Sequence, residues 1–235
     1  MLRPRIPGPA PSSRFAIMSC LLLKRGLLIG IVGWLMLNAQ FSNAAEPTRL
    51  YQQRTLTTVQ RDLSALGLQD CPSIQALDEV RQLAVCRIAD AKAASRLYWF
   101  LIDARQPGTS AIRFRSGDFG DADYVQIAVF SKAQDGTELI LAESGAEFSY
   151  GVQVYTLDGM QVQRVGAIAE VLNEDGEARS ILPALQIRDL GATVRFSFTA
   201  PVMVPDRQGQ YSEVAPEQVC YVLKGAQLRR GTDCR

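Results

Sequence analysis

The stretch from Ala122 to Ala169 constrains the fold most, because it has the pattern of four consecutive strands joined by short turns. Asp135-Gly136 and Asp158-Gly159 fall between strands, and Asp-Gly tolerates the positive φ of a tight hairpin turn. We therefore expect an antiparallel meander on which the rest of the chain packs. Its four strands share a high content of Val, Ile, Leu and Tyr, and they span Tyr124–Phe130, Thr137–Leu141, Tyr150–Leu157 and Gln161–Ile168.

The first of these strands has a clear period of two. Val125, Ile127 and Val129 alternate with Gln126 and Ala128. Alternate residues of a strand lie on opposite faces, so the three branched side chains share one face. This pattern predicts that Ile127 lies in the core.

Two amphipathic helices are predicted before the meander. Apolar residues recur at spacings of three and four between Glu46 and Leu68, and Gly67 marks a possible end. Ser73 is a candidate N-cap for a second helix that runs to about Ala84. The apolar face of this second helix would hold Ile74, Leu77, Val80, Leu83 and Ala84.

Further strand patterns surround the meander. Leu97 to Ile102 is a continuous apolar run, as expected of a strand buried on both faces or covered by the helices. Ile112 to Arg115 alternates as a half-exposed strand, and Asn173 to Gly176 has turn composition. Other predicted segments are a hairpin over Leu185–Thr199, a loop over Val202–Gln210, and strands at Val219–Leu223 and Ala226–Leu228.

Together these segments predict an α+β fold. Two N-terminal helices would pack on a mostly antiparallel sheet of about eight to ten strands. The pattern leaves open whether the sheet stays open, folds into a sandwich or closes as a barrel.

Residues 1–45 have the features of a secretory signal. Lys24-Arg25 precedes an apolar run from Gly26 to Leu37, and Ser42-Asn43-Ala44 supplies the small residues that a signal peptidase reads. The run has about 12 residues, fewer than the roughly 20 that span a membrane. We expect cleavage after Ala44 or Ala45, which leaves residues 46–235 as a single exported domain, periplasmic or secreted.

Four cysteines follow the cleavage site, and an even number in an exported chain favours disulfides. They are Cys71, Cys86, Cys220 and Cys234. Pairing of sequence neighbours joins the first two and the last two. A straight helix over Ser73–Ala84 would be roughly 18 Å long, whereas bridged Cα atoms lie within about 7 Å. The segment therefore doubles back, or it is not one helix, or the pairing is different.

The chain contains no histidine, which excludes several common kinds of chemistry. Ser-His-Asp and Cys-His catalysis, histidine zinc sites and histidine pH switches are all ruled out. Residues 1–45 hold five of the 25 basic residues and no acid, so 20 basic and 24 acidic residues follow, a net charge of −4. This mildly acidic part has no overall electrostatic signature for nucleic acid, and no motif implies a cofactor.

The densest acidic cluster is the loop from Gly117 to Asp123. Asp118, Asp121 and Asp123 are candidate Ca²⁺ ligands, because Ca²⁺ takes several oxygen ligands. With Phe119 and the strand that follows, this loop resembles one Asp-rich blade of the FG-GAP and VCBS repeat proteins. It lacks the full alternating Asp pattern and does not repeat, so the resemblance assigns no ligand. A solvated Asp- and Gly-rich turn is the alternative.

Glu143 and Glu147 are the candidate carboxylate pair for acid–base chemistry. They flank Ser144-Gly145-Ala146, which we place on a loop between two core strands. A glycosidase needs two carboxyl groups about 5 to 9 Å apart across a cleft. The chain contains neither a Gly-x-Ser-x-Gly elbow nor a Ser-x-x-Lys motif.

The sequence thus favours a binding protein over an enzyme. We expect an exported, disulfide-bonded protein that binds an envelope protein, for example as an inhibitor of a wall-acting enzyme or toxin. The alternatives are a histidine-free hydrolase that uses paired carboxylates and a calcium-stabilised surface module.

Overall fold

The computed structural model describes residues 49–89, 95–132, 137–231 and 234, and within these residues every strand pairing is antiparallel. The strands form three five-stranded sheets and two separate hairpins. Sheet A has the order β1 (Arg49–Leu50), β14 (Leu185–Asp189), β15 (Val194–Phe198), β18 (Cys220–Lys224), β19 (Gln227–Arg230). Sheet B has the order β11 (Gln161–Ile168), β10 (Ser149–Asp158), β9 (Thr137–Gly145), β8 (Tyr124–Ser131), β2 (Gln52–Gln53).

Sheet C completes the set with β3 (Thr57–Thr58), β4 (Asp70–Ala76), β5 (Arg81–Ala89), β6 (Ser95–Asp103) and β7 (Ile112–Arg115). The hairpins are β12 (Leu172–Glu174) with β13 (Glu177–Arg179), and β16 (Val202–Pro205) with β17 (Tyr211–Val214). The helical turns among the described residues are the short 3₁₀ segments η1 (Ser64–Leu66), η2 (Gly108–Ala111), η3 (Leu182–Ala184) and η4 (Pro216–Gln218).

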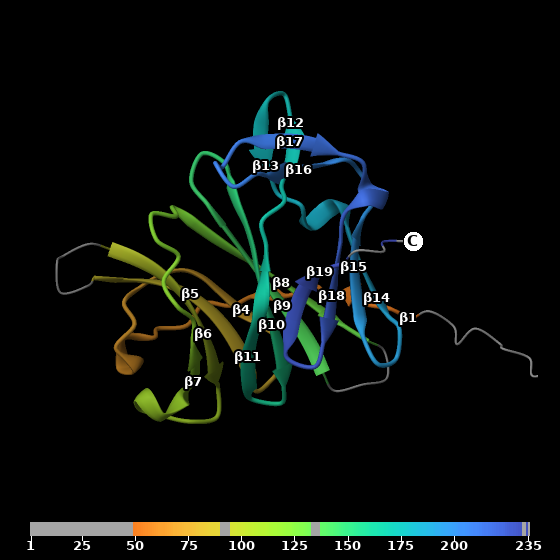
Figure 1. The fold of residues 1–235 in the computed structure, drawn as a ribbon. Helices are drawn as coiled ribbons and strands as arrows, with labels where there is room; N and C mark the ends of the chain where they lie inside the picture. Colours follow the sequence, from red (N-terminus) through yellow and green to blue (C-terminus); the bar gives the residue numbers. More distant parts are fainter. Residues whose placement is uncertain (1–48, 90–94, 133–136, 232–233, 235) are drawn as a thin grey trace, which may run out of the picture. The chain divides into compact units, whose positions relative to one another are not determined.

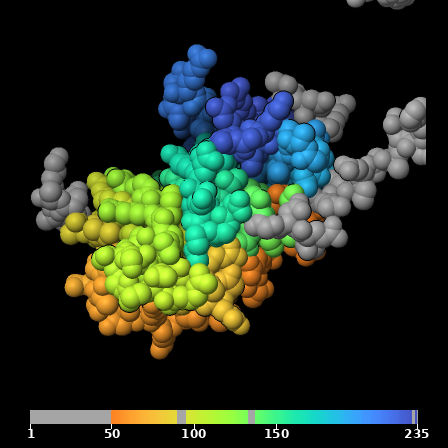
Figure 2. Space-filling model, turned by 90° about the horizontal axis from the view of Figure 1, so that it is seen from below, coloured from red at the N-terminus to blue at the C-terminus, as the bar shows by residue number. Residues whose placement is uncertain are grey.

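Sheet B is the middle layer, and both of its faces are buried. Leu139 and Leu141 of β9 pack with Phe196 and Leu223 of sheet A. Ile140, one position away in β9, lies in a second cluster that includes side chains of sheet C. Figures 1 and 2 show sheet B between the other two sheets. The predicted meander is therefore the central layer of the core.

Sheet C has a third apolar cluster on its outer face. Phe100 and Ile102 of β6 lie there with Leu63 and Leu66, which come from the segment around η1. Leu101 of β6 belongs instead to the cluster against sheet B. The apolar run Leu97–Ile102 is thus a strand buried on both faces, as the sequence predicts.

One short segment joins all three sheets. Between residues 49 and 58 the chain contributes β1 to sheet A, β2 to sheet B and β3 to sheet C. At the opposite edge of sheets A and B, a Cβ on Gly166 of β11 would lie 2.7 Å from Leu228 Cβ of β19. Sheets A and B therefore pack face to face, and their edges lie close together on both sides.

The four strands of the predicted meander are confirmed as β8 to β11. Gly159 has φ 58°, and Asp158 pairs with Gln161, so the β10–β11 link is a two-residue turn with glycine first. The Asp135-Gly136 turn lies outside the described residues. Val125, Ile127 and Val129 share one buried cluster, so the predicted facing of the first strand is correct.

The mostly antiparallel sheet of the predicted α+β fold is confirmed, but its helical part is not, because over the described residues no helix forms where the two helices were predicted. Residues 49–68 hold three two-residue strands and η1, while residues 46–48 lie outside the described part. Ser73–Ala84 is the β4–β5 hairpin instead. Asp78 Oδ1 accepts hydrogen bonds from the backbone N–H groups of Val80 and Arg81 and so closes its turn.

The helix prediction failed because β5 is buried on both faces. Leu83 and Val85 face sheet B, and Ala84 and Cys86 face the outer cluster of sheet C. A strand buried on both sides loses its period of two, so a helix cannot be told from it by periodicity alone.

The hairpin also resolves the cysteine pairing. Cys71 of β4 is bonded to Cys86 of β5, and Cys220 is bonded to Cys234. Both bridges join sequence neighbours, as the simplest pairing predicts, and the first is possible because Ser73–Ala84 doubles back.

Two smaller predictions also change. Val202–Gln210 was predicted as a loop, but Val202–Pro205 is strand β16 and only the remainder is the turn to β17. The strands form three sheets rather than one sheet of eight to ten strands. The predicted turn at Asn173–Gly176 is confirmed, with Asp175 at φ 53° and Gly176 at φ 87°.

Candidate functional site

Glu143 is a fully buried carboxylate near the end of β9. Its Oε1 accepts a hydrogen bond from Ser149 Oγ at 2.6 Å, and its Oε2 accepts one from Ser180 Oγ at 2.5 Å. Glu143 has the parity of Leu139 and Leu141, so it lies on the face of sheet B that packs against sheet A. It was predicted on a loop, and it is in fact the last charged residue of a central strand.

A bulge in β10 brings Ser149 to this carboxylate. The β9–β10 register shifts between Ser149 and Val152, and Gly151 lies inside the shift with φ 95°. A Cβ on Gly151 would lie 2.5 Å from the carbonyl oxygen of Ile168, so a side chain is excluded there. Ser149 Oγ also accepts a hydrogen bond from Gly151 N. The glycine therefore permits the backbone bend that turns the serine toward Glu143.

The other buried carboxylates have different partners. Glu138 forms ion pairs with Arg54 and Arg81, which ties sheet B to sheet C. Asp103 pairs with two arginines, whereas Glu170 accepts a hydrogen bond from Tyr221 Oη at 2.7 Å. Burial, together with this bond to a carboxylate, raises the pKa of Tyr221. Buried charge is costly unless it is paired. The ion pairs of Asp103 and Glu138 therefore explain why these carboxylates can be buried, and no functional role is needed for them.

Three aromatic side chains are exposed beside Glu143, and we call Tyr124, Phe148 and Tyr150 the aromatic trio. The rings of Phe148 and Tyr150 are 5.5 Å apart between centroids and nearly perpendicular. Tyr124 pairs with Gly145 across the β8–β9 ladder. Burial of its hydroxyl and then the nearby charge of Glu143 raise the pKa of Tyr124.

Gly145 allows the members of this trio to pack closely, because it has no side chain. A Cβ at this position would lie 2.3 Å from the Phe148 carbonyl oxygen and 2.6 Å from Tyr124 Oη. Any larger residue would push apart the β9–β10 turn and the Tyr124 ring. No local pattern in the sequence indicates this cluster, because its members come from two strands and a turn.

A groove of about 610 Å³ adjoins the site. The hairpins β12–β13 and β16–β17 and the segment before η3 supply its walls, and the two hairpins lie together at the top of Figure 1. Arg179, which pairs with Glu177 at 2.5 Å, and Ser180 are on the wall nearest Glu143. The remaining lining residues are Leu172, Asn173, Glu174, Pro183, Ala200, Pro201 and Glu213.

The predicted carboxylate pair is divided between two environments. Glu143 is buried in β9, while Glu147 is exposed in the β9–β10 turn. Ser149 and Ser180 were not predicted as partners of Glu143. Ser180 is 37 positions away, and no spacing in the sequence indicates such a contact.

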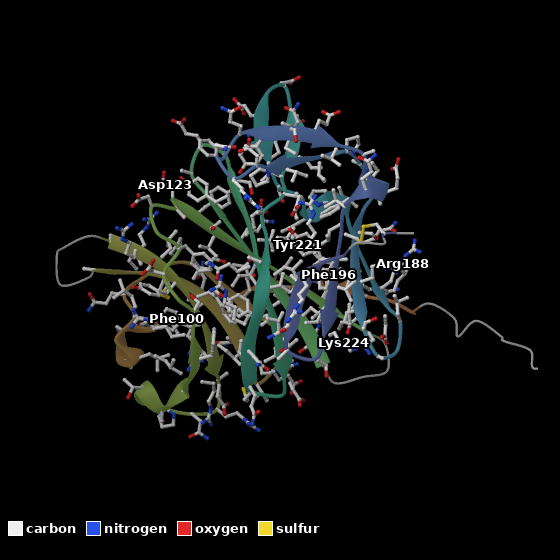
Figure 3. The ribbon with its side chains drawn as sticks, viewed as in Figure 1. Phe100, Asp123, Arg188, Phe196, Tyr221 and Lys224 are labelled. Carbon is white, nitrogen blue, oxygen red and sulfur yellow. A yellow bond between two sulfur atoms is a disulfide. The ribbon has the colours of Figure 1, made fainter. Side chains whose placement is uncertain are left out.

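The acidic loop joins two different sheets. It runs from β7 of sheet C to β8 of sheet B, whereas the strands of one propeller blade share a sheet. Asp121 forms an ion pair with Arg96, and Asp118 Oδ1 accepts a hydrogen bond from Gly120 N. Within the described residues no three acidic or cysteine side chains form a group that could hold a metal ion. Figure 3 labels Asp123 at the β8 end of the loop.

No family model matches the chain, and no curated protein or solved structure matches it either. Among the described residues, no helix is long and apolar enough to cross a membrane. The function must therefore be argued from the residues of the site themselves.

Proposed function

We propose that this is an exported binding protein that contacts a protein partner through the aromatic trio. The observation that carries the proposal is the exposure of Tyr124, Phe148 and Tyr150 together, at 36%, 50% and 42%. Large exposed aromatic side chains are enriched at protein interfaces and dominate their binding energy. The groove beside them, with Arg179 on its wall, offers a polar rim for the same contact.

Export is the setting that we propose for this contact. Cleavage after Ala44 or Ala45 would release residues 46–235 as a single domain into the periplasm or the medium. The two disulfides support this, because such bonds persist in oxidising compartments. A concrete version is an inhibitor of an envelope-acting enzyme or toxin. The signal segment lies outside the described residues.

The test is capture of a partner from an envelope extract by the purified mature protein. We expect a stoichiometric partner that the Phe148→Ala/Tyr150→Ala double variant loses by at least tenfold in affinity, since each interface aromatic contributes about 1 kcal/mol or more. Leu190→Ala is the matched control, because Leu190 is also 42% exposed but lies outside the trio. Equal capture by the control and the double variant would contradict the proposal.

A histidine-free hydrolase is the second candidate, and one contact favours it. Ser180 lines the groove and donates a hydrogen bond to the buried carboxylate of Glu143, which is the geometry of a nucleophile beside a base. Turnover of a glycan, ester or peptide substrate that is abolished by both Ser180→Ala and Glu143→Gln, in variants that circular dichroism shows to be folded, would establish it. The binding proposal expects no turnover from the wild-type protein.

A further inference from the structure

The outer face of sheet A has an unusual distribution of charge. Strand alternation places Phe196 and Tyr221 inward, where they are buried against sheet B. Figure 3 shows Arg188 and Lys224 with these two aromatic residues in the same sheet. We call the outward cations Arg188, Arg195, Lys224 and Arg229 the basic face.

Three of these cations fall in one row across the sheet. Arg188 of β14 pairs directly with Arg195 of β15, and Arg195 pairs with Val222 of β18. Val222 in turn pairs with Arg229 of β19. Neighbouring strands are about 4.8 Å apart, so the row extends about 14 Å from Arg188 to Arg229.

No described outward position of these five strands is acidic. Arg188 and Arg229 are exposed and hydrogen-bond to neutral glutamines, Arg188 to Gln186 at 3.2 Å and Arg229 to Gln227 at 2.5 Å. Exposed cations gathered on one face, in a chain whose residues after position 45 carry a net charge of −4, indicate an anionic partner.

We propose that the basic face docks on an anionic lipid surface. Arg188, Lys224 and Arg229 are exposed on three different strands of this face, which suits a flat array of lipid phosphates better than one enclosed anion. Leu50, 54% exposed, pairs with Arg188 and extends the row with an apolar side chain. Cations beside an exposed apolar residue match a surface of charged headgroups over hydrocarbon. The proposal involves none of the aromatic trio and does not depend on the proposed function.

The test is co-sedimentation of the mature protein with vesicles of phosphatidylglycerol mixed with phosphatidylcholine, and with phosphatidylcholine vesicles alone. We expect binding to the anionic vesicles only. Binding should weaken sharply as salt rises from 0.01 M to 1 M, which shortens the Debye length from about 30 Å to about 3 Å.

The deciding comparison uses two double variants with the same change in charge. Each basic residue near an anionic surface contributes about fivefold in affinity, so Arg188→Gln/Arg229→Gln should bind about 25-fold more weakly. Arg164→Gln/Arg207→Gln, at exposed sites outside sheet A, should bind like the wild type. Unchanged melting temperatures would show that both variants fold.

Three results would overturn the proposal. One is wild-type protein that sediments with neither kind of vesicle, and another is equal binding to both. The third is an equal loss of affinity in the two double variants, which would indicate attraction by total charge. If the basic face instead binds a soluble acidic protein, polyglutamate will bind the protein while the anionic vesicles do not.

Discussion

Ser180 donates a hydrogen bond to Glu143 Oε2 at 2.5 Å, although 37 positions separate the two residues along the chain. The bond ties the segment after β13 to the central strand β9 and so links the wall of the groove to the core. Because Glu143 is fully buried, each of its oxygens depends on a protein donor.

Ser180→Ala should therefore destabilise the protein. One buried carboxylate oxygen would lose its serine donor, which costs about 1–3 kcal/mol in the free energy of unfolding. Urea unfolding of the mature protein measures this. Ser212→Ala, at an exposed position of β17, is the control and should change little. If the two variants unfold at the same urea concentration, Glu143 does not need the hydrogen bond from Ser180.

Ile127→Asp should prevent folding. Ile127 is 8% exposed and lies between sheets B and C, so the substitution would bury a carboxylate without a partner. Gln126→Asp, one position away on an exposed side chain, should still fold. Circular dichroism and thermal unfolding of both proteins measure the difference, and a cooperative transition for Ile127→Asp near the wild-type temperature contradicts this packing.

Stability at acid pH should depend on Asp103. Its hydrogen bond from Arg105, and then that from Arg113, lower the pKa of Asp103 from 3.8 to about 2 in the folded state. The unfolded state therefore binds more protons as the pH falls. The stabilising contribution is complete above about pH 3.8 and is lost as the pH falls to about 2.

Melting temperatures between pH 5 and pH 2 test this titration. Asp103→Asn should lower the melting temperature at pH 5 and should flatten its fall toward pH 2. Asp175→Asn is a suitable control, because Asp175 is exposed in a left-handed conformation that asparagine accepts. Parallel pH profiles for wild type and Asp103→Asn would contradict the assignment.

Calcium should leave the melting temperature unchanged. Of the three candidate ligands, Asp121 is paired with Arg96, and Asp118 accepts a backbone hydrogen bond within its own loop. Three carboxylates on one short loop do not supply the six to eight oxygens that Ca²⁺ takes. A bound ion at one hundred times its dissociation constant would add about 2.7 kcal/mol.

Thermal unfolding in millimolar Ca²⁺ distinguishes the two cases. A rise in melting temperature that Asp121→Asn/Asp123→Asn abolishes would establish a calcium site. It would also make the calcium-stabilised module the leading functional candidate.

Local signals in the sequence were sufficient to predict many of the strands. The meander, the facing of Val125, Ile127 and Val129, and the hairpin over Leu185–Thr199 all follow from alternation and turn residues, which act over a few positions. The sequence also suggested that each cysteine pairs with its nearest neighbour along the chain, because short chain separations favour contact. For Ser73–Ala84 the same rules failed, since burial on both faces of β5 removed the alternation that identifies a strand.

Only the tertiary structure determined which distant residues share a site. Glu143 meets Ser180 because β9 is central and the chain returns past it after β13. Residues 49–58 join three sheets because they pair in turn with β14, β8 and β4, which lie far apart in the sequence, so the segment's own residues do not reveal its partners. For a related reason, the basic face could not be predicted from the net charge. Charge is a sum over the chain, whereas a face is an arrangement in space that strand pairing alone creates.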